Sequence, residues 1–212
     1  MEFDIASYIK QLSVSILPFL MAVTIHEVSH GYAAYMLGDD TAKRMGRLTL
    51  NPFAHIDIFG LIFLLITRLF GWAKPVPVDF SKLRLKKYGP AIVSFAGPLS
   101  NFILAIVSAI FLKLVMNSGQ GDNLFANYFM EPIFYMLLYS VQINIALGTF
   151  NLIPILPMDG GRILQAFLPY DIAYRYSQTE RYGFFIILLL LITGVVGKII
   201  FPIIDFFIKL LL

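Results

Sequence analysis

The sequence predicts an all-α integral membrane protein with four transmembrane helices, and two observations support this fold class. Of the 212 residues, 58% are hydrophobic and only 14% are charged, whereas about a quarter of the residues in a soluble domain are charged. Four stretches approach or exceed the roughly 20 apolar residues that a membrane-spanning helix requires. Cysteine is absent, so any bound metal ion needs nitrogen and oxygen ligands.

The four predicted spans carry few charged side chains. The first holds three ionisable residues in its later half, the second and third hold no charge, and the fourth is interrupted only by Lys198. The N-terminus lacks a basic region and a small-residue cleavage site, so we expect no cleaved signal peptide. The spans are predicted at residues 11–37, 90–112, 132–158 and 183–204.

Residues 58–72 are predicted to form a re-entrant or interfacial helix rather than a fifth span. Only ten apolar residues, Ile58 to Thr67, precede Arg68, and a stretch of that length is too short for a full crossing. The flanking sequences GRLTLNP and KPVPVDF indicate a short β-hairpin or sheet near the cytoplasmic face. Residues 1–212 are therefore expected to form a single membrane-embedded domain.

The distribution of Lys and Arg predicts the orientation. Nine of the 16 Lys and Arg residues lie in 38–89, and Arg162, Arg175 and Arg181 lie between the third and fourth spans. The positive-inside rule therefore places 38–89 and 156–182 in the cytoplasm. The first and third spans then run in the same direction, and their late residues lie at similar depth near the cytoplasmic face.

The sequence HEVSH, which contains His26, Glu27 and His30, lies late in the first span. Residues i and i+4 share a helix face, so both imidazoles can bind one metal ion. Glu27 projects away from that pair, where a carboxylate can take a proton from metal-bound water and pass it to a leaving amine. A buried histidine more often only forms hydrogen bonds, but ionisable residues inside a membrane indicate function, so we expect a metal site.

Asp159 is the candidate third ligand. Catalytic zinc sites commonly have three protein ligands and one open position. Asp159 follows an otherwise uncharged stretch and is expected at the depth of the two histidines. It also follows Pro157 and precedes GGRIL, so capping of a helix is the alternative role. The expected depth favours ligation.

Five sequences in a fixed order resemble the site-2 protease family of intramembrane metalloproteases, in particular its small bacterial and archaeal members without PDZ or CBS domains. These sequences are HEVSH, NPFAHID, GWAKPVPVDF, SFAGPLSN and FNLIPILPMDGGRIL. The resemblance implies one Zn²⁺ per chain, bound by His26, His30 and Asp159. It further implies that Glu27 is the general base and that Asn151 holds the substrate or the developing oxyanion.

The same resemblance implies the reaction and its setting. The expected function is hydrolysis of peptide bonds within or near the transmembrane segments of single-pass membrane proteins, as in regulated intramembrane proteolysis. The enzyme would lie in the lipid bilayer of the cell (inner) membrane, with its active site near the cytoplasmic side.

Three further polar residues have structural interpretations. Pro154 and Pro157 remove backbone donors, so the alternative role of Asn151 is to satisfy the freed backbone groups. Asn101 in SFAGPLSN is expected to form hydrogen bonds between helices. His55 is expected to be a structural histidine in a loop.

Other function classes are less well supported. A membrane metal-ion transporter is the main alternative, but it needs ligands at several depths, and the other spans contain no histidine or acidic residue at mid-depth. A non-catalytic scaffold would not need Glu27. The net charge of +3 and the absence of an Arg-rich helix argue against a nucleic-acid partner.

Overall fold

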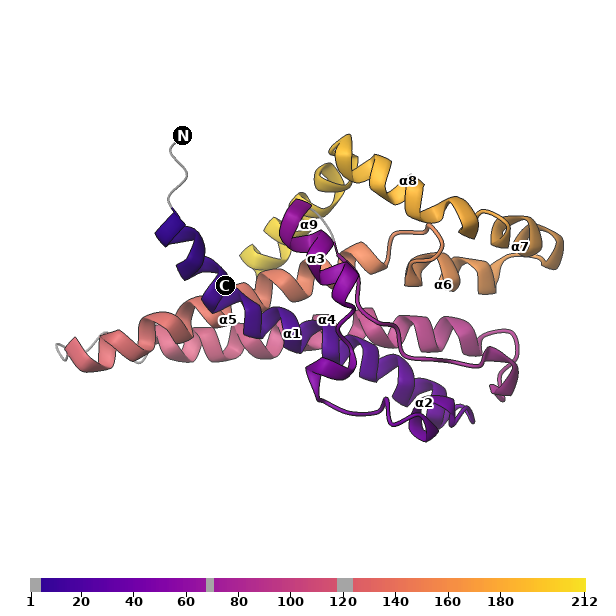
Figure 1. Ribbon diagram of the computed structural model, residues 1–212, viewed down its shortest axis with the longest axis horizontal. Coiled ribbons are helices and arrows are strands. Elements are labelled where there is room, and N and C mark those ends of the chain that lie inside the picture. Colours follow the sequence, from indigo (N-terminus) through magenta and orange to yellow (C-terminus); the bar gives the residue numbers. More distant parts are fainter. Residues whose placement is uncertain (1–4, 68–70, 118–123) are drawn as a thin grey trace.

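The computed structural model describes residues 5–67, 71–117 and 124–212, and most of these residues are helical (Figure 1). Among them, three helices are long and apolar enough to cross a membrane. They are α1 (Ile5–Met36), α4 (Gly89–Asn117) and α5 (Leu124–Asn151). The three helices pack against one another, and in Figure 1 α4 runs opposite to α1 and α5. The first three predicted spans are therefore found, and α1 and α5 run in the same direction.

The third span begins and ends earlier in the chain than predicted. Helix α5 ends at Asn151, whereas the apolar stretch continues to Met158. Residues 152–158 are irregular, because Pro154 and Pro157 have no N–H to donate to a preceding turn. The chain then enters α6 (Asp159–Phe167).

The fourth predicted span, 183–204, is not one straight helix. It is divided between α8 (Glu180–Ile192) and α9 (Val195–Leu211), which are bent by 72°. Gly194 between them has φ +74, a left-handed conformation that commonly ends a helix at glycine. On α9, Ile204, Phe207 and Ile208 pack against buried residues of α4 and α5. The pair counts as a fourth candidate span only if both helices are taken together.

The segment between α1 and α4 contains α2 (Thr41–Arg44), η1 (Pro52–Ala54), α3 (Ile58–Thr67) and η2 (Phe80–Lys82). An isolated antiparallel bridge joins Ile56 to Ala73, and the N–H of Lys74 donates to the carbonyl of His55 at 2.9 Å. The two ends of the segment that contains α3 are therefore paired with each other. Within the predicted 58–72 segment, residues 68–70 lie outside the described residues.

The expected short β-hairpin or sheet is not confirmed, because the described part of the chain contains no strand. Pro75 and Pro77 cannot donate to a ladder, and the N–H of Val76 between them donates to Oε2 of Glu27 at 2.8 Å. The Arg47 guanidinium instead donates to the carbonyls of Lys74 and Pro75 at 2.9 and 3.3 Å. Side-chain hydrogen bonds thus connect these two segments in place of a ladder.

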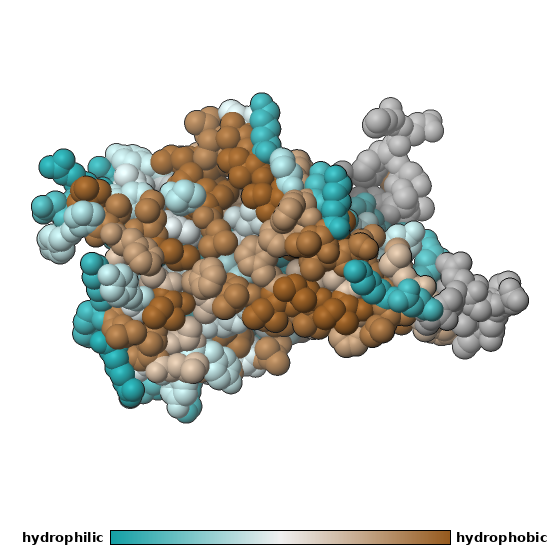
Figure 2. Space-filling model, turned by 180° about the vertical axis from the view of Figure 1, so that it is seen from behind, coloured by the Kyte–Doolittle hydropathy of each residue, from teal (hydrophilic) through white to brown (hydrophobic). Residues whose placement is uncertain are grey.

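The surface of the molecule is largely apolar. Figure 2 shows hydrophobic side chains over the middle and many hydrophilic ones gathered at the end on its left. Large apolar side chains such as Ile103, Phe111 and Phe185 are exposed on α4 and α8. Extended exposed apolar surface of this kind marks contact with a membrane or a partner, as expected for an integral membrane protein. Helices α2, α6 and α7 (Tyr170–Ser177) lie at one end of the bundle (Figure 1).

A buried carboxylate anchors the segment that follows α1. Asp39 is completely buried, and it accepts hydrogen bonds from the N–H groups of Thr41 at 3.0 Å and Asp79 at 2.7 Å. Burial by itself raises the pKa of Asp39, but the hydrogen bonds from Thr41 and Asp79 and the charge of Lys82 outweigh it and hold the pKa below its usual value. The ionised carboxylate therefore stabilises this connection.

We expect Asp39→Ala to destabilise the protein by about 1–3 kcal/mol, because two partly buried N–H groups lose their acceptor. Because the pKa of Asp39 is lower in the folded protein, the stabilisation is fully present at pH values above the unfolded-state pKa of about 3.9. It is lost as the pH falls through the folded-state pKa. Thermal unfolding in detergent should therefore separate wild type from the variant at neutral pH and less so in acid. Asp40→Ala, which removes a partly exposed ion pair with Arg44, is the matched control; equal effects of the two variants would contradict the anchoring role.

Candidate metal centre

Three side chains converge near the C-terminal end of α1. His26 and His30 lie one turn apart on α1, and Asp159 is the first residue of α6. Nε2 of His26 is 3.0 Å from Nε2 of His30. Oδ2 of Asp159 lies 3.2 Å from the first nitrogen and 3.4 Å from the second. Among the described residues, this is the one group of three such ligands that converges.

The second ring nitrogen of each histidine is engaged elsewhere. Nδ1 of His30 lies 2.7 Å from the carbonyl oxygen of Val93, and Nδ1 of His26 lies 2.6 Å from Oδ1 of Asn101. Both oxygens can only accept, so each Nδ1 carries the proton and each neutral Nε2 presents a lone pair. Oδ2 of Asp159 is buried and has no hydrogen-bond partner. Three electron-pair donors therefore face one another with no proton between them.

This arrangement fits a zinc ion. Three atoms that each lie 2.0–2.1 Å from a tetrahedral zinc ion are about 3.3 Å apart. The separations of 3.0, 3.2 and 3.4 Å in the cluster are close to that value. Two imidazoles and one carboxylate form a common donor set of catalytic zinc sites, which leave the fourth position open. A cation would also satisfy the buried oxygen of Asp159.

Glu27 shares the cavity of this cluster without belonging to it. Its Oε2 accepts the hydrogen bond from the Val76 N–H at 2.8 Å. A cavity of about 600 Å³ is lined by both histidines, Glu27, Val76, Asn151 and Asp159. A carboxylate in this position can reach a molecule bound in the cavity while the Val76 N–H holds one of its oxygens.

Two glycines allow the elements of the site to approach one another. A Cβ atom at Gly97 of α4 would collide with Nε2 of His30 and lie 2.7 Å from Cε1 of His26. A Cβ atom at Gly160 would collide with the carbonyl of Leu152. The glycines of SFAGPLSN and MDGG therefore have a steric explanation.

The other candidate residues lie around the cluster. Nδ2 of Asn151, the last residue of α5, donates to the carbonyl of Leu147 one turn earlier in the same helix at 3.0 Å; this carbonyl is not one that Pro154 or Pro157 leaves without a donor. His55 is buried and donates from Nε2 to the carbonyl of Thr49 at 2.9 Å. It also lines the cavity, but it is not one of the three converging groups.

The prediction that Asn101 forms hydrogen bonds between helices is confirmed. The structure adds Asn144 as a partner of Asn101 and the carbonyl of Val93 as a partner of His30. Asn101 on α4 contacts His26 on α1 and Asn144 on α5. Asn144 was not singled out from the sequence, although a polar residue within an uncharged span was an available signal. The carbonyl of Val93 is a backbone group that every residue type has, so the sequence could not indicate that it bonds His30.

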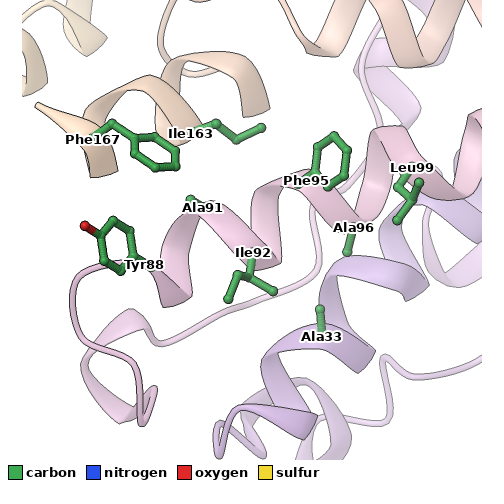
Figure 3. A pocket seen from close by; sticks show the side chains of 9 residues that line it. All are labelled: Ala33, Tyr88, Ala91, Ile92, Phe95, Ala96, Leu99, Ile163 and Phe167. Carbon is green, nitrogen blue, oxygen red and sulfur yellow. The ribbon is translucent and has the colours of Figure 1, made fainter.

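A second cavity lies apart from this chemistry. Figure 3 shows its lining along α4, with Ile163 and Phe167 of α6 on one side and Ala33 of α1 on the other. It measures about 600 Å³ and has an apolar lining. The rings of Tyr88 and Phe167 lie with their centroids 5.6 Å apart at one end. No His, Asp or Glu lines this cavity, so it offers no set of metal ligands.

Comparison with known proteins agrees with the geometry. The model of peptidase family M50 matches residues 14–194. YwhC of Bacillus subtilis (strain 168) is 37% identical over 197 residues, which cover 91% of this chain and 88% of that protein. Rip2 of Mycolicibacterium smegmatis is 27% identical over 204 residues, which cover 95% of this chain and 75% of that protein. Both are provisionally named zinc metalloproteases.

A third relative comes from an archaeon. The zinc metalloprotease MJ0392 of Methanocaldococcus jannaschii is 28% identical over 158 residues, which cover 74% of this chain and 35% of that protein. No solved structure gives a significant match to the chain.

Proposed function

The chain belongs to peptidase family M50, the family of the site-2 proteases, and on that premise we propose that it is an intramembrane zinc metalloendopeptidase. It hydrolyses peptide bonds within or near the transmembrane segments of other membrane proteins. The observation that carries the proposal is the convergence of His26, His30 and Asp159 in a cavity that also contains Glu27. Metal-dependent hydrolysis needs both a metal site and a nearby base, and this cavity holds candidates for both.

The roles of the residues follow from their contacts. His26 and His30 would hold the metal through Nε2, because each Nδ1–H is bonded to an oxygen elsewhere, and Asp159 would hold it through Oδ2. When bound, Zn²⁺ supplies a Lewis acid that polarises the scissile carbonyl and lowers the pKa of a water molecule.

Glu27 acts as the general base and then as the general acid. It takes a proton from the attacking water and gives it to the amine nitrogen as the C–N bond breaks. The hydrogen bond from Val76 keeps Oε2 in place, which leaves Oε1 to move the proton. Asn151 is the candidate to hold the substrate carbonyl with the amide hydrogen that Leu147 does not use.

The orientation in the membrane follows from charge. Together α8 and α9 form the fourth span, which places both termini on the side opposite to 38–89. The Lys and Arg residues of 38–89 and 156–182 favour the cytoplasm for these segments. The helix α3 is re-entrant, which is supported by the bridge between Ile56 and Ala73. The active site then lies near the cytoplasmic face of the cell (inner) membrane, in a single domain of residues 1–212.

The preferred substrates are single-pass membrane proteins, because a small site within a bilayer admits one segment at a time. The transporter alternative has no support. A transport path needs ligands at several depths, and residues 5–67, 71–117 and 124–212 contain one convergent group of three.

One assay tests the proposal directly. Purified protein is incubated with a single-pass model substrate, with and without a chelator, and zinc is then added back. We expect the chelator to abolish cleavage and zinc to restore it, as followed by the appearance of the two fragments. Metal flux into liposomes without any cleavage would contradict the proposal and favour a transporter.

A further inference from the structure

We propose that Asn101 and Asn144 form a hydrogen-bond relay that sets the tautomer and the orientation of His26, so that both asparagines are positioning residues for the metal centre. The inference rests on the proposed function, because it concerns a ligand of the proposed zinc site. It assigns a task to two buried polar residues that the proposed mechanism leaves unused.

The relay crosses three helices. His26 on α1 faces Oδ1 of Asn101 on α4 at 2.6 Å. Nδ2 of Asn101 donates to Oδ1 of Asn144 on α5 at 2.8 Å and to the carbonyl of Ala22 at 3.2 Å. Nδ2 of Asn144 in turn donates to the carbonyl of Ser140 at 2.8 Å. Both asparagine side chains are completely buried, so water does not offer alternative partners.

Two backbone carbonyls give the relay its direction. A carbonyl oxygen only accepts, so the carbonyl of Ser140 requires the NH₂ group of Asn144 to face it. The oxygen of Asn144 must then face Asn101, and the NH₂ group of Asn101 must face Asn144 and Ala22. The oxygen of Asn101 is thereby turned toward His26, which must carry its proton on Nδ1. Each amide has one orientation in which every neighbour is satisfied.

The consequence is an Nε2 lone pair on His26 that points at Asp159. Without the relay, the imidazole could carry its proton on Nε2, where it would occupy the direction of the metal. The tautomer of His30 does not depend on other side chains, because its Nδ1 is bonded directly to the carbonyl of Val93. The two ligands are therefore held differently, one by the backbone and one by side chains that substitution can remove.

The first test is the zinc affinity of the full chain in detergent, measured by competition with a chromophoric chelator. Removal of an outer partner of a metal ligand typically costs roughly 10- to 100-fold in affinity, and we expect this loss for Asn101→Leu. Asn144→Leu should lose less, because the carbonyl of Ala22 still orients Asn101. Thr149→Val, which changes another buried side chain of α5 whose Oγ1 has no partner, should match wild type.

The second test reads the tautomer itself. In ¹⁵N–¹H spectra of the zinc-free protein, where no metal fixes the tautomer, wild type should show Nδ1–H signals for both His26 and His30. Asn101→Leu should lose or shift the His26 signal only, and the His30 signal is the internal control. If Asn101→Leu does not fold, Asn144→Leu takes its place, with faster exchange of the His26 proton expected.

The outcomes separate the two proposals. Zinc affinity within twofold of wild type together with an unchanged His26 signal would overturn the relay and leave the zinc site intact. A wild-type protein that does not bind zinc would overturn the proposed function and the relay with it.

Discussion

Replacement of Glu27 by Gln is expected to abolish peptide hydrolysis while zinc stays bound. General acid–base catalysis contributes roughly 100- to 10,000-fold to a rate, and Gln cannot accept the proton of the attacking water. The amide oxygen of Gln can still accept the hydrogen bond from Val76, so the local structure should persist. The measurement is the cleavage rate of a model substrate, with zinc content determined on the same preparation.

Glu131→Gln is the control for this experiment. Glu131 is exposed and pairs with Lys10 at 2.9 Å, and it does not line the cavity of the cluster. The variant should cleave at the wild-type rate. Full activity of Glu27→Gln would remove Glu27 from the mechanism, and loss of zinc from that variant would assign it a structural task instead.

Asp159→Asn is expected to lose both zinc and activity. The substitution removes the negative charge at the cluster but keeps the shape of the side chain. The loss of zinc affinity should reach at least the roughly 10- to 100-fold seen when an outer partner is removed, because Asp159 is the proposed ligand itself. A competition titration and the cleavage assay measure the two effects.

This variant also distinguishes ligation from helix capping. Asn caps a helix about as well as Asp, so a capping role alone would leave zinc affinity and unfolding temperature unchanged. A ligand gives a different result. Without zinc, Asp159→Asn should be as stable as wild type or more stable, because an unpaired buried charge is removed. With zinc, wild type should gain stability and the variant little. Asp171→Asn, in the first turn of α7, is the matched control.

Much of the fold and two of the three residues of the cluster could be predicted from local sequence. Spans depend on about 20 consecutive residues, and the approach of His26 to His30 depends only on the i and i+4 spacing of one helix. Thr193–Gly194 is a local signal for the end of a helix. The apolar residues on both sides nevertheless predict one continuous span there. The expected hairpin is absent from the described residues for a different reason. The N–H of Val76, which a ladder would have used, donates to the side chain of Glu27 instead.

By itself, the sequence determined the apolar helices, the two imidazoles on one face and the acidic residue beside them, because each depends on neighbours within a few turns. Only the tertiary structure decided which groups orient those imidazoles and leave Asp159 Oδ2 without a partner. The carbonyl of Val93 and the amide of Asn101 reach His30 and His26 across 63 and 75 positions of the chain. The physical reason is that these hydrogen bonds join different helices, so they depend on how the helices pack. Gly97 permits the close packing of α4 against the histidines, and the local periodicity of the sequence does not encode it.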